Sequence, residues 1–182
     1  MTARKLLLAA FVAALSSSVA QARPRPAGHL GGRAFEANKT FGLGLELGEP
    51  TGLNGKYFLS GDRALDFGIG DIYHYVNRTG IHIYGDYLFH PVSLAATDVF
   101  ELPLYVGIGG RFWDFNDTGQ PGTDNAYALG VRAPIGISMD FNNVPLDVFL
   151  QFVPVLDFYG GNAPHTIYLD FDVSLGVRYW FN

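Results

Sequence analysis

Residues 167–181, next to the C-terminus, carry the most restrictive pattern in the sequence. Every odd position in this stretch is apolar: Ile167, Leu169, Phe171, Val173, Leu175, Val177, Tyr179 and Phe181. The even positions are mostly charged, small or polar. Because successive side chains of a β-strand point to opposite sides, a period of two residues predicts a strand with one apolar and one polar face. The direction of the apolar face, towards a soluble core or towards lipid, decides the class of protein.

The N-terminus has the three parts of a secretory signal peptide. Arg4 and Lys5 are positively charged, residues 6–15 form a short apolar run, and residues 20–22 form a small-x-small cleavage site. The apolar run is too short for a transmembrane helix. We therefore expect residues 1–22 to be a cleaved signal peptide, with a retained N-terminal anchor as the alternative.

The rest of the chain divides into a leader and one domain. Residues 23–39 contain Pro and Gly without periodicity and are expected to form a flexible periplasmic leader, and residues 40–182 have the length of a single domain. Only 16 % of all residues are charged, against roughly 25 % in soluble domains, while 23 are Gly and 15 % are aromatic. No apolar run after the signal peptide reaches the ~18 residues of a membrane helix. This composition, in an exported chain, is typical of a membrane β-barrel.

Alternating segments follow one another through residues 40–182. They cover residues 41–47, 53–60, 65–70, 81–90, 102–113, 127–140, 146–157 and 167–181. Pro134 and Pro154 interrupt two of them and predict irregular pairing, because proline cannot donate a backbone hydrogen bond. Eight segments predict an all-β, eight-stranded antiparallel up-and-down transmembrane β-barrel with both termini in the periplasm. The connections expected outside are residues 48–51, 71–80, 116–125 and 159–166, and those expected on the periplasmic side are residues 61–63, 90–101 and 142–145.

The polar faces of the segments favour a membrane barrel over a soluble one. They are rich in glycine: Gly42, Gly44, Gly68, Gly70, Gly107, Gly109, Gly130, Gly136 and Gly176. After the signal peptide the only lysines are Lys39 and Lys56, whereas a face in contact with water would be dense in charge. Glycine, single charges and aromatic residues instead suit a narrow, crowded interior. A soluble lipocalin-like carrier, with its apolar face inside, is the alternative.

Aromatic residues near the strand ends agree with this orientation. They are Phe41, Tyr57, Phe89, Phe112, Tyr127, Phe141, Phe158, Tyr179 and Phe181. Such positions match the interfacial girdles of membrane barrels.

Several longer motifs also point to this class of protein. The stretch LGLELGEPTGLNGKYFLSGDRALDFGIG is followed by GDYLFH, LPLYVGIGGRF, GVRAPIG, PLDVFLQFVPVLD and LGVRYWF. Together they resemble a widespread family of small bacterial outer-membrane β-barrels of unknown function, over about residues 42–181. The resemblance implies an eight-stranded barrel and no assigned activity. Asn182 departs from the pattern, since many such barrels end on the aromatic residue itself.

Polar side chains on the inward faces predict a charge network in the lumen. Its expected members are Glu46, Lys56, Asp66, Asp86, Arg111, Arg132, Gln151, Asp172 and Arg178. Isolated charges in a narrow interior are costly, so these groups must pair or hold water. We expect a salt-bridged, plugged lumen, and the alternatives are a narrow ion path or a ligand or catalytic site.

No arrangement of residues predicts an enzyme, a cofactor or a metal site. His82 and Asp86 share a face but lie about 13 Å apart along one strand. The remaining candidates are His74 and His165 in outer connections, with Asp71 or Asp157 nearby. No Ser lies beside a His as an activated nucleophile requires. A lipid-modifying barrel enzyme is the alternative to a non-enzymatic protein.

The expected location is the cell outer membrane, with lipid as the main partner. The sequence predicts a monomer with a structural or surface-interaction role, and any extracellular ligand would meet the connections at residues 71–80, 116–125 and 159–166. A nucleic-acid partner would require a basic stripe, whereas the formal net charge of the whole chain is −5.

Overall fold

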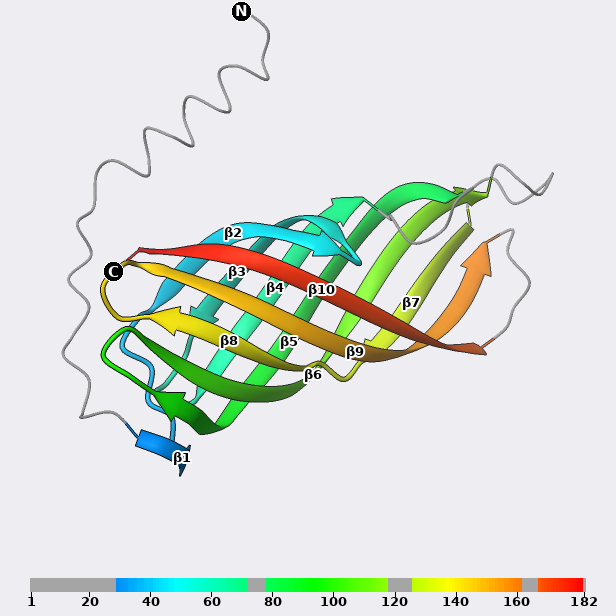
Figure 1. Cartoon of the computed structure of the whole chain (residues 1–182). Coiled ribbons are helices and arrows are strands. Elements are labelled where there is room, and N and C mark those ends of the chain that lie inside the picture. The colour runs from blue at the N-terminus through cyan, green and yellow to red at the C-terminus, as the bar shows by residue number, and fades with distance from the viewer. Residues whose placement is uncertain (1–28, 72–77, 118–125, 162–166, 182) are drawn as a thin grey trace, which may run out of the picture.

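The computed structural model describes residues 29–71, 78–117, 126–161 and 167–181 as strands and their connections (Figure 1). The strands are β1 (His29–Arg33), β2 (Phe41–Gly48), β3 (Thr51–Phe58), β4 (Arg63–Asp71), β5 (Arg78–Ala96), β6 (Phe100–Asp117), β7 (Ala126–Arg132), β8 (Ile135–Phe141), β9 (Leu146–Gly161) and β10 (Ile167–Phe181). All of them pair antiparallel in one sheet. Among the described residues, no helix could cross a membrane.

The pairings close the sheet into a ring. β2 to β6 pair in sequence order, β6 pairs with both β7 and β8, both of these pair with β9, and β10 joins β9 to β2. β7 and β8 are two halves of one position in the ring, so the ring has eight strands. The all-β antiparallel fold predicted from the alternating segments is therefore confirmed.

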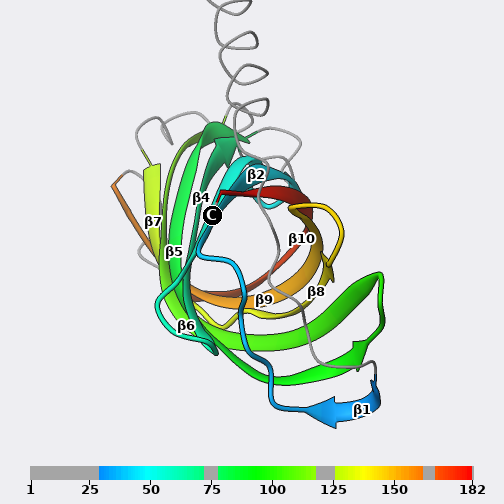
Figure 2. The same cartoon turned by 90° about the vertical axis from the view of Figure 1, so that its left-hand side faces the viewer.

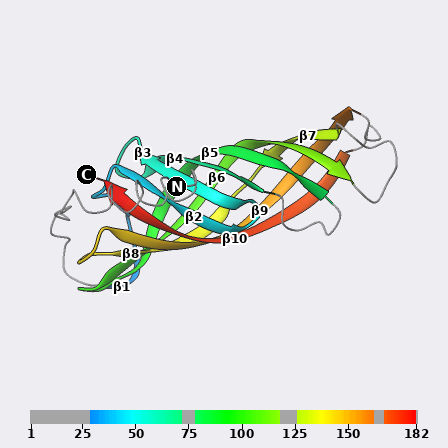
Figure 3. The same cartoon turned by 90° about the horizontal axis from the view of Figure 1, so that it is seen from above.

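The ring is strongly staggered. Starting from Gly44 on β2, the paired residues around the ring are Asn54, Gly68, Tyr84, Arg111, Gly130, Asp157 and finally Tyr168 on β10. Gly44 itself pairs with Arg178, about ten residues further along β10 than Tyr168. With a rise of ~3.3 Å per residue and ~4.8 Å between strands, this stagger tilts the strands by roughly 40° from the axis of the ring. Figure 3 shows this oblique course.

The two prolines inside the alternating segments lie close together, on neighbouring strands, where β7 ends and β8 begins. Pro134 separates β7 from β8, as expected, whereas β9 runs through Pro154 without a break. Ala133 N donates to Pro154 O over 3.0 Å, and Gly107 N donates to Pro134 O over 2.8 Å. Pro154 has no N–H to donate, and it lies opposite the break between β7 and β8, where no strand needs that donor. β9 therefore keeps its pairing with β10 through Pro154.

Residues 90–101 differ from the expected long periplasmic connection. β5 and β6 continue past the ring as a paired hairpin, and the turn occupies only residues 97–99, where Thr97 N donates to Phe100 O over 2.8 Å. Register shifts between Phe89 and Val92 and between Ser93 and Ala96 break the period of two here. This extension lies at the end of the ring that also carries the C-terminus, here called the C-terminal end (Figures 1 and 3).

Residues 29–39 also differ from the expected flexible leader. Residues 29–33 form β1, which pairs with the extended part of β5. Residues 34–40, the strap, then cross the C-terminal end of the ring to reach β2 (Figure 2). Residues 1–28, including the expected signal peptide, lie outside the described residues, as do most of the expected outer connections.

Side chains alternate between an exposed outer face and a buried inner face. On β10, Leu175 is 49 % exposed, whereas its neighbour Ser174 is 1 % exposed. The same alternation places apolar residues outside and charged residues inside on the other strands of the ring. The interior is therefore polar and the outside apolar, the reverse of a soluble core.

Candidate functional site

The interior of the ring is the main candidate site. All nine residues expected to form the charge network are buried there: Glu46, Lys56, Asp66, Asp86, Arg111, Arg132, Gln151, Asp172 and Arg178. Three arginines at successive heights organise it, and each stacks on an aromatic ring.

Arg111 holds three carboxylates furthest from the C-terminal end. Its guanidinium donates to Asp157, to Asp172 Oδ1 over 2.7 Å and to Asp170 Oδ2 over 2.7 Å. The same group lies 4.8 Å from the centre of the Trp113 ring. One cation thus stabilises three buried or part-buried acids at this level.

Arg132 occupies the middle of the interior. Nε donates to Asp86 Oδ1 over 3.1 Å, and Nη1 donates to Asp172 Oδ2 over 3.0 Å. The guanidinium stacks 4.0 Å from the centre of the Tyr84 ring. Because Asp172 also accepts hydrogen bonds from Arg111, this carboxylate links Arg111 and Arg132 into one network.

Arg178 forms the third level, closest to the C-terminal end. Nη2 donates to Asp147 Oδ2 over 3.0 Å and Nη1 donates to Asp66 Oδ1 over 2.9 Å, while the guanidinium lies 4.1 Å from the Phe149 ring centre. The close approach of Phe149 requires Gly176 beside it, since a Cβ at that position would overlap the ring. The glycines of the polar face thus provide room for the rings that the arginines stack on.

Neutral groups connect the lower arginine to the middle one. Asn54 Nδ2 donates to Tyr84 Oη over 2.7 Å and approaches both oxygens of Asp66, and Tyr84 Oη donates to Glu46 Oε2 over 3.0 Å. Glu46 Oε1 has no hydrogen-bond partner within the described part of the chain. Glu46 is therefore held by a phenol and forms no ion pair with the described residues.

Gln151 joins the network as a neutral member. Its Nε2 donates to Ser174 Oγ over 2.8 Å, and Tyr105 Oη donates to its Oε1 over 3.4 Å. It thereby bridges β6 and β10 across the interior without adding charge.

Lys56 differs from its expected ion-pair role. Its Nζ donates to His90 Nε2 over 2.8 Å and lies 4.6 Å from the centre of the Tyr105 ring. His90 Nδ1 is 3.2 Å from Asp62 O, so these partners assign the imidazole proton to Nδ1. Among the described residues, no carboxylate lies within ion-pair distance of this ammonium.

The strap closes the C-terminal end beneath this pair. Phe35 is 5 % exposed, with its ring centre 5.3 Å from that of His90 and 5.9 Å from that of Phe58. Lys39 is paired with Asp140 and also donates to Phe141 O over 3.0 Å. An aromatic side chain and a buried ion pair therefore hold the strap across the opening seen in Figure 2.

Some residues of the interior are missing from the predicted set. Asp147 and Asp157 have inward parity in their segments, so the alternation marks them as interior, but it does not show that each pairs with an arginine. His90 also has inward parity in residues 81–90, but the alternation does not show its contact with Lys56, and Phe35 was missed because the aperiodic leader carries no such signal.

His82 and Asp86, two of the candidates for catalysis, do not contact each other in the structure. His82 is buried, 3.8 Å from Glu49 Oε2, and neither ring nitrogen makes a hydrogen bond within the described ranges. Asp86 is engaged by Arg132 instead. His74 and His165 lie outside the described residues, and no group of three or more metal-binding side chains gathers in the part of the chain that is described. No family model, curated protein or solved structure matches the chain.

Proposed function

We propose that the protein is an integral outer-membrane β-barrel, anchored by its apolar outer face and closed by its own interior, with a structural or surface-interaction role. The observation that carries this proposal is the inverted distribution of polarity. Arginine, aspartate and glutamate side chains fill the interior, whereas leucine, isoleucine, valine and phenylalanine cover the outside. A surface that meets lipid favours this arrangement, because exposing so much apolar area to water would cost free energy.

The height of the apolar face supports a membrane-spanning band. The outward row of β4 reads Arg63, Leu65, Phe67, Ile69 and Asp71, with a charge at each end. This row is ~27 Å long along the strand, or ~20 Å along the axis after the tilt, against ~25 Å for the apolar band of such barrels. An apolar row of nearly this height, bounded by a charge at each end, supports a membrane-spanning band.

Aromatic contacts at the C-terminal end support an interfacial girdle. Phe41 stacks on Phe181 with ring centres 6.0 Å apart, and Tyr179 lies 5.0 Å from Phe181. Arg63 covers the Phe89 ring at 5.6 Å from its centre. Aromatic rings beside a cation are typical of the boundary between lipid and water.

The interior supports a closed barrel over a pore, an enzyme or a soluble carrier. Each arginine is bound by carboxylates and stacked on a ring, so movement of ions along the axis would have to break these pairs. A carrier of apolar ligands would need an apolar cavity, which the charged interior does not offer.

Fractionation and gel mobility test the proposal. Outer-membrane fractions should contain the protein, and its unheated form should migrate differently from the boiled form, because a closed barrel resists detergent until heated. A matched sample of a soluble periplasmic protein should show no shift. Recovery in the aqueous phase, without a heat-dependent shift, would contradict the proposal.

Planar-bilayer recording tests the closure of the lumen. The purified protein should produce no steady conductance steps, because the three arginine clusters and the strap block the axis. A known porin reconstituted in the same lipid provides the positive control. Regular steps whose size follows the salt concentration would favour the narrow-pore alternative.

A further inference from the structure

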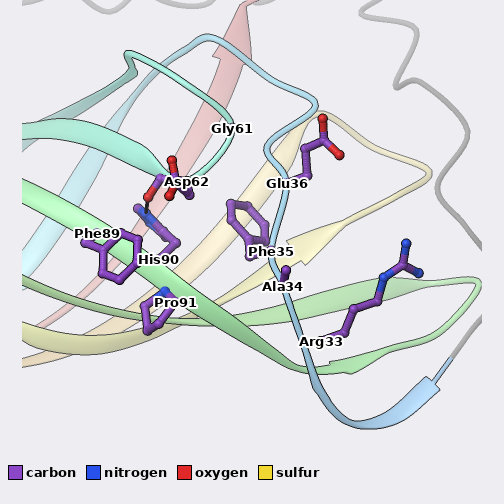
Figure 4. A pocket seen from close by; sticks show the side chains of 9 residues that line it. All are labelled: Arg33, Ala34, Phe35, Glu36, Gly61, Asp62, Phe89, His90 and Pro91. Carbon is purple, nitrogen blue, oxygen red and sulfur yellow. Dashed lines mark hydrogen bonds between the residues drawn. The ribbon is translucent and has the colours of Figure 1, made fainter.

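A cavity of about 520 Å3 lies at the C-terminal end of the ring (Figure 4). Its lining comes from the strap and β1 on one side and from β5 and the turn between β3 and β4 on the other: Arg33, Ala34, Phe35, Glu36, Gly61, Asp62, Phe89, His90 and Pro91. Its volume falls in the range of roughly 300–1,000 Å3 that is usual for small-molecule sites.

The cavity is a gap in the sheet. β4 pairs with β5 only as far as Arg63 and Phe89, and β1 takes over the same edge of β5 at Ser93. Pro91 lies between these two pairings and has no N–H to leave unpaired. His90 N donates to Asp62 O over 2.8 Å at the rim of the gap. The strap lies against this gap, with the Phe35 ring packed on His90.

The lining combines an apolar floor with charges of both signs. Phe89 is 39 % exposed on the outer face and belongs to the aromatic residues at the end of the apolar band. Arg33, at the end of β1, and Glu36, on the strap, are exposed, and Figure 4 shows their charged ends on the side away from Phe89. Asp62, on the turn, brings a second carboxylate to the rim. The cavity therefore has a lipid-facing ring at one side and a cation and a carboxylate at the other, while Asp62 on the rim is already held by Arg63 and Ser60.

We propose that this cavity binds the headgroup of a phosphoethanolamine phospholipid from the periplasmic leaflet, an inference that rests on the membrane location proposed above. Arg33 binds the phosphate, Glu36 binds the ammonium, and the acyl chains lie along Phe89. A zwitterionic headgroup matches the cation and the carboxylate at this side of the cavity, whereas a purely anionic one would leave Glu36 without a cation to bind.

Native mass spectrometry of the full-length mature protein in maltoside micelles tests this site. The probes are dilauroyl phosphatidylethanolamine, dilauroyl phosphatidylglycerol and free O-phosphoethanolamine. We expect one phosphatidylethanolamine per chain, bound about tenfold more tightly than phosphatidylglycerol, and no retention of the free headgroup. Arg33→Gln should weaken phosphatidylethanolamine binding about tenfold, and Glu36→Gln should remove the preference between the two lipids. Both positions are exposed, so neither change should disturb folding.

Asp98→Asn is the matched control, because Asp98 is exposed in the turn between β5 and β6 at the same end of the ring but does not line the cavity. It should leave the lipid preference unchanged. Equal binding of the two lipids, or equal effects of Glu36→Gln and Asp98→Asn, would overturn the site, as would retention of free O-phosphoethanolamine as strong as that of the lipid. The heat-dependent gel shift of the same samples separates the two proposals, since a folded barrel without lipid preference refutes this site alone.

Discussion

Replacing Arg132 with Met should destabilise the folded protein by about 3–5 kcal/mol. The substitution keeps much of the side-chain volume but removes the cation that binds Asp86 and shares Asp172. Asp172 retains Arg111, whereas Arg132 is the only ion-pair partner of Asp86 among the described residues. Urea unfolding in detergent micelles, followed by tryptophan fluorescence, measures the change in the free energy of unfolding.

A second substitution separates lost charge pairing from lost packing. Arg132→Met combined with Asp86→Leu removes both members of the pair and should recover much of the lost stability, because no unpaired carboxylate then remains at that position. Arg63→Met, at an exposed position, should have a much smaller effect on stability than Arg132→Met. If Arg132→Met were as mild as Arg63→Met, the interior ion pairs would not stabilise the fold.

Introducing a charge into the apolar band should have the second large effect. Leu175→Arg should cost about 2–4 kcal/mol in lipid vesicles, because Leu175 lies far from both ends of the outward face of β10. Its paired outward neighbours, Leu47 and Leu150, are exposed and apolar as well. Urea unfolding from vesicles measures the difference from the unsubstituted protein.

The matched control lies on the same face of the same strand. Ile167→Arg places the charge at the first residue of β10, at the end of the strand away from the C-terminus. There the cost in the free energy of unfolding should be only about 0–1 kcal/mol. On a surface in contact with water, both substitutions would change stability by about 0.5 kcal/mol or less. Equal and small effects at Leu175 and Ile167 would therefore contradict a lipid-facing band.

The sequence predicts the faces of the strands well because the side-chain period is exactly two residues. A strand that is buried on one side must keep this parity, so Arg111, Arg132 and Arg178 could all be placed inside before any partner was known. The sequence did not predict which interior groups pair: Lys56 was expected in an ion pair, whereas it contacts His90. Which groups meet depends on the stagger of the whole ring, and no single segment contains that information.

The C-terminal end of the ring could not be predicted for a different reason. The bulges between Phe89 and Ala96 disrupt the alternation of β5, so its extension reads as a loop. Phe35 and Lys39 lie in a segment without periodicity, and their burial depends on contacts with His90 and Asp140 that are distant in sequence. The local sequence pattern thus identifies the strands of the ring, whereas the strap and the cavity arise from tertiary packing.

A nitroxide scan along β10 tests the central claim, that the apolar face meets lipid. The chain contains no cysteine, so single cysteines from Leu169 to Tyr179 can each be labelled uniquely in protein folded into lipid vesicles. At odd positions we expect high collision rates with oxygen and low rates with a water-soluble nickel chelate, with the largest difference between the two near Leu175, in the middle of the bilayer. At even positions we expect low collision rates with both reagents. High nickel accessibility at the odd positions, with no dependence on depth, would contradict it.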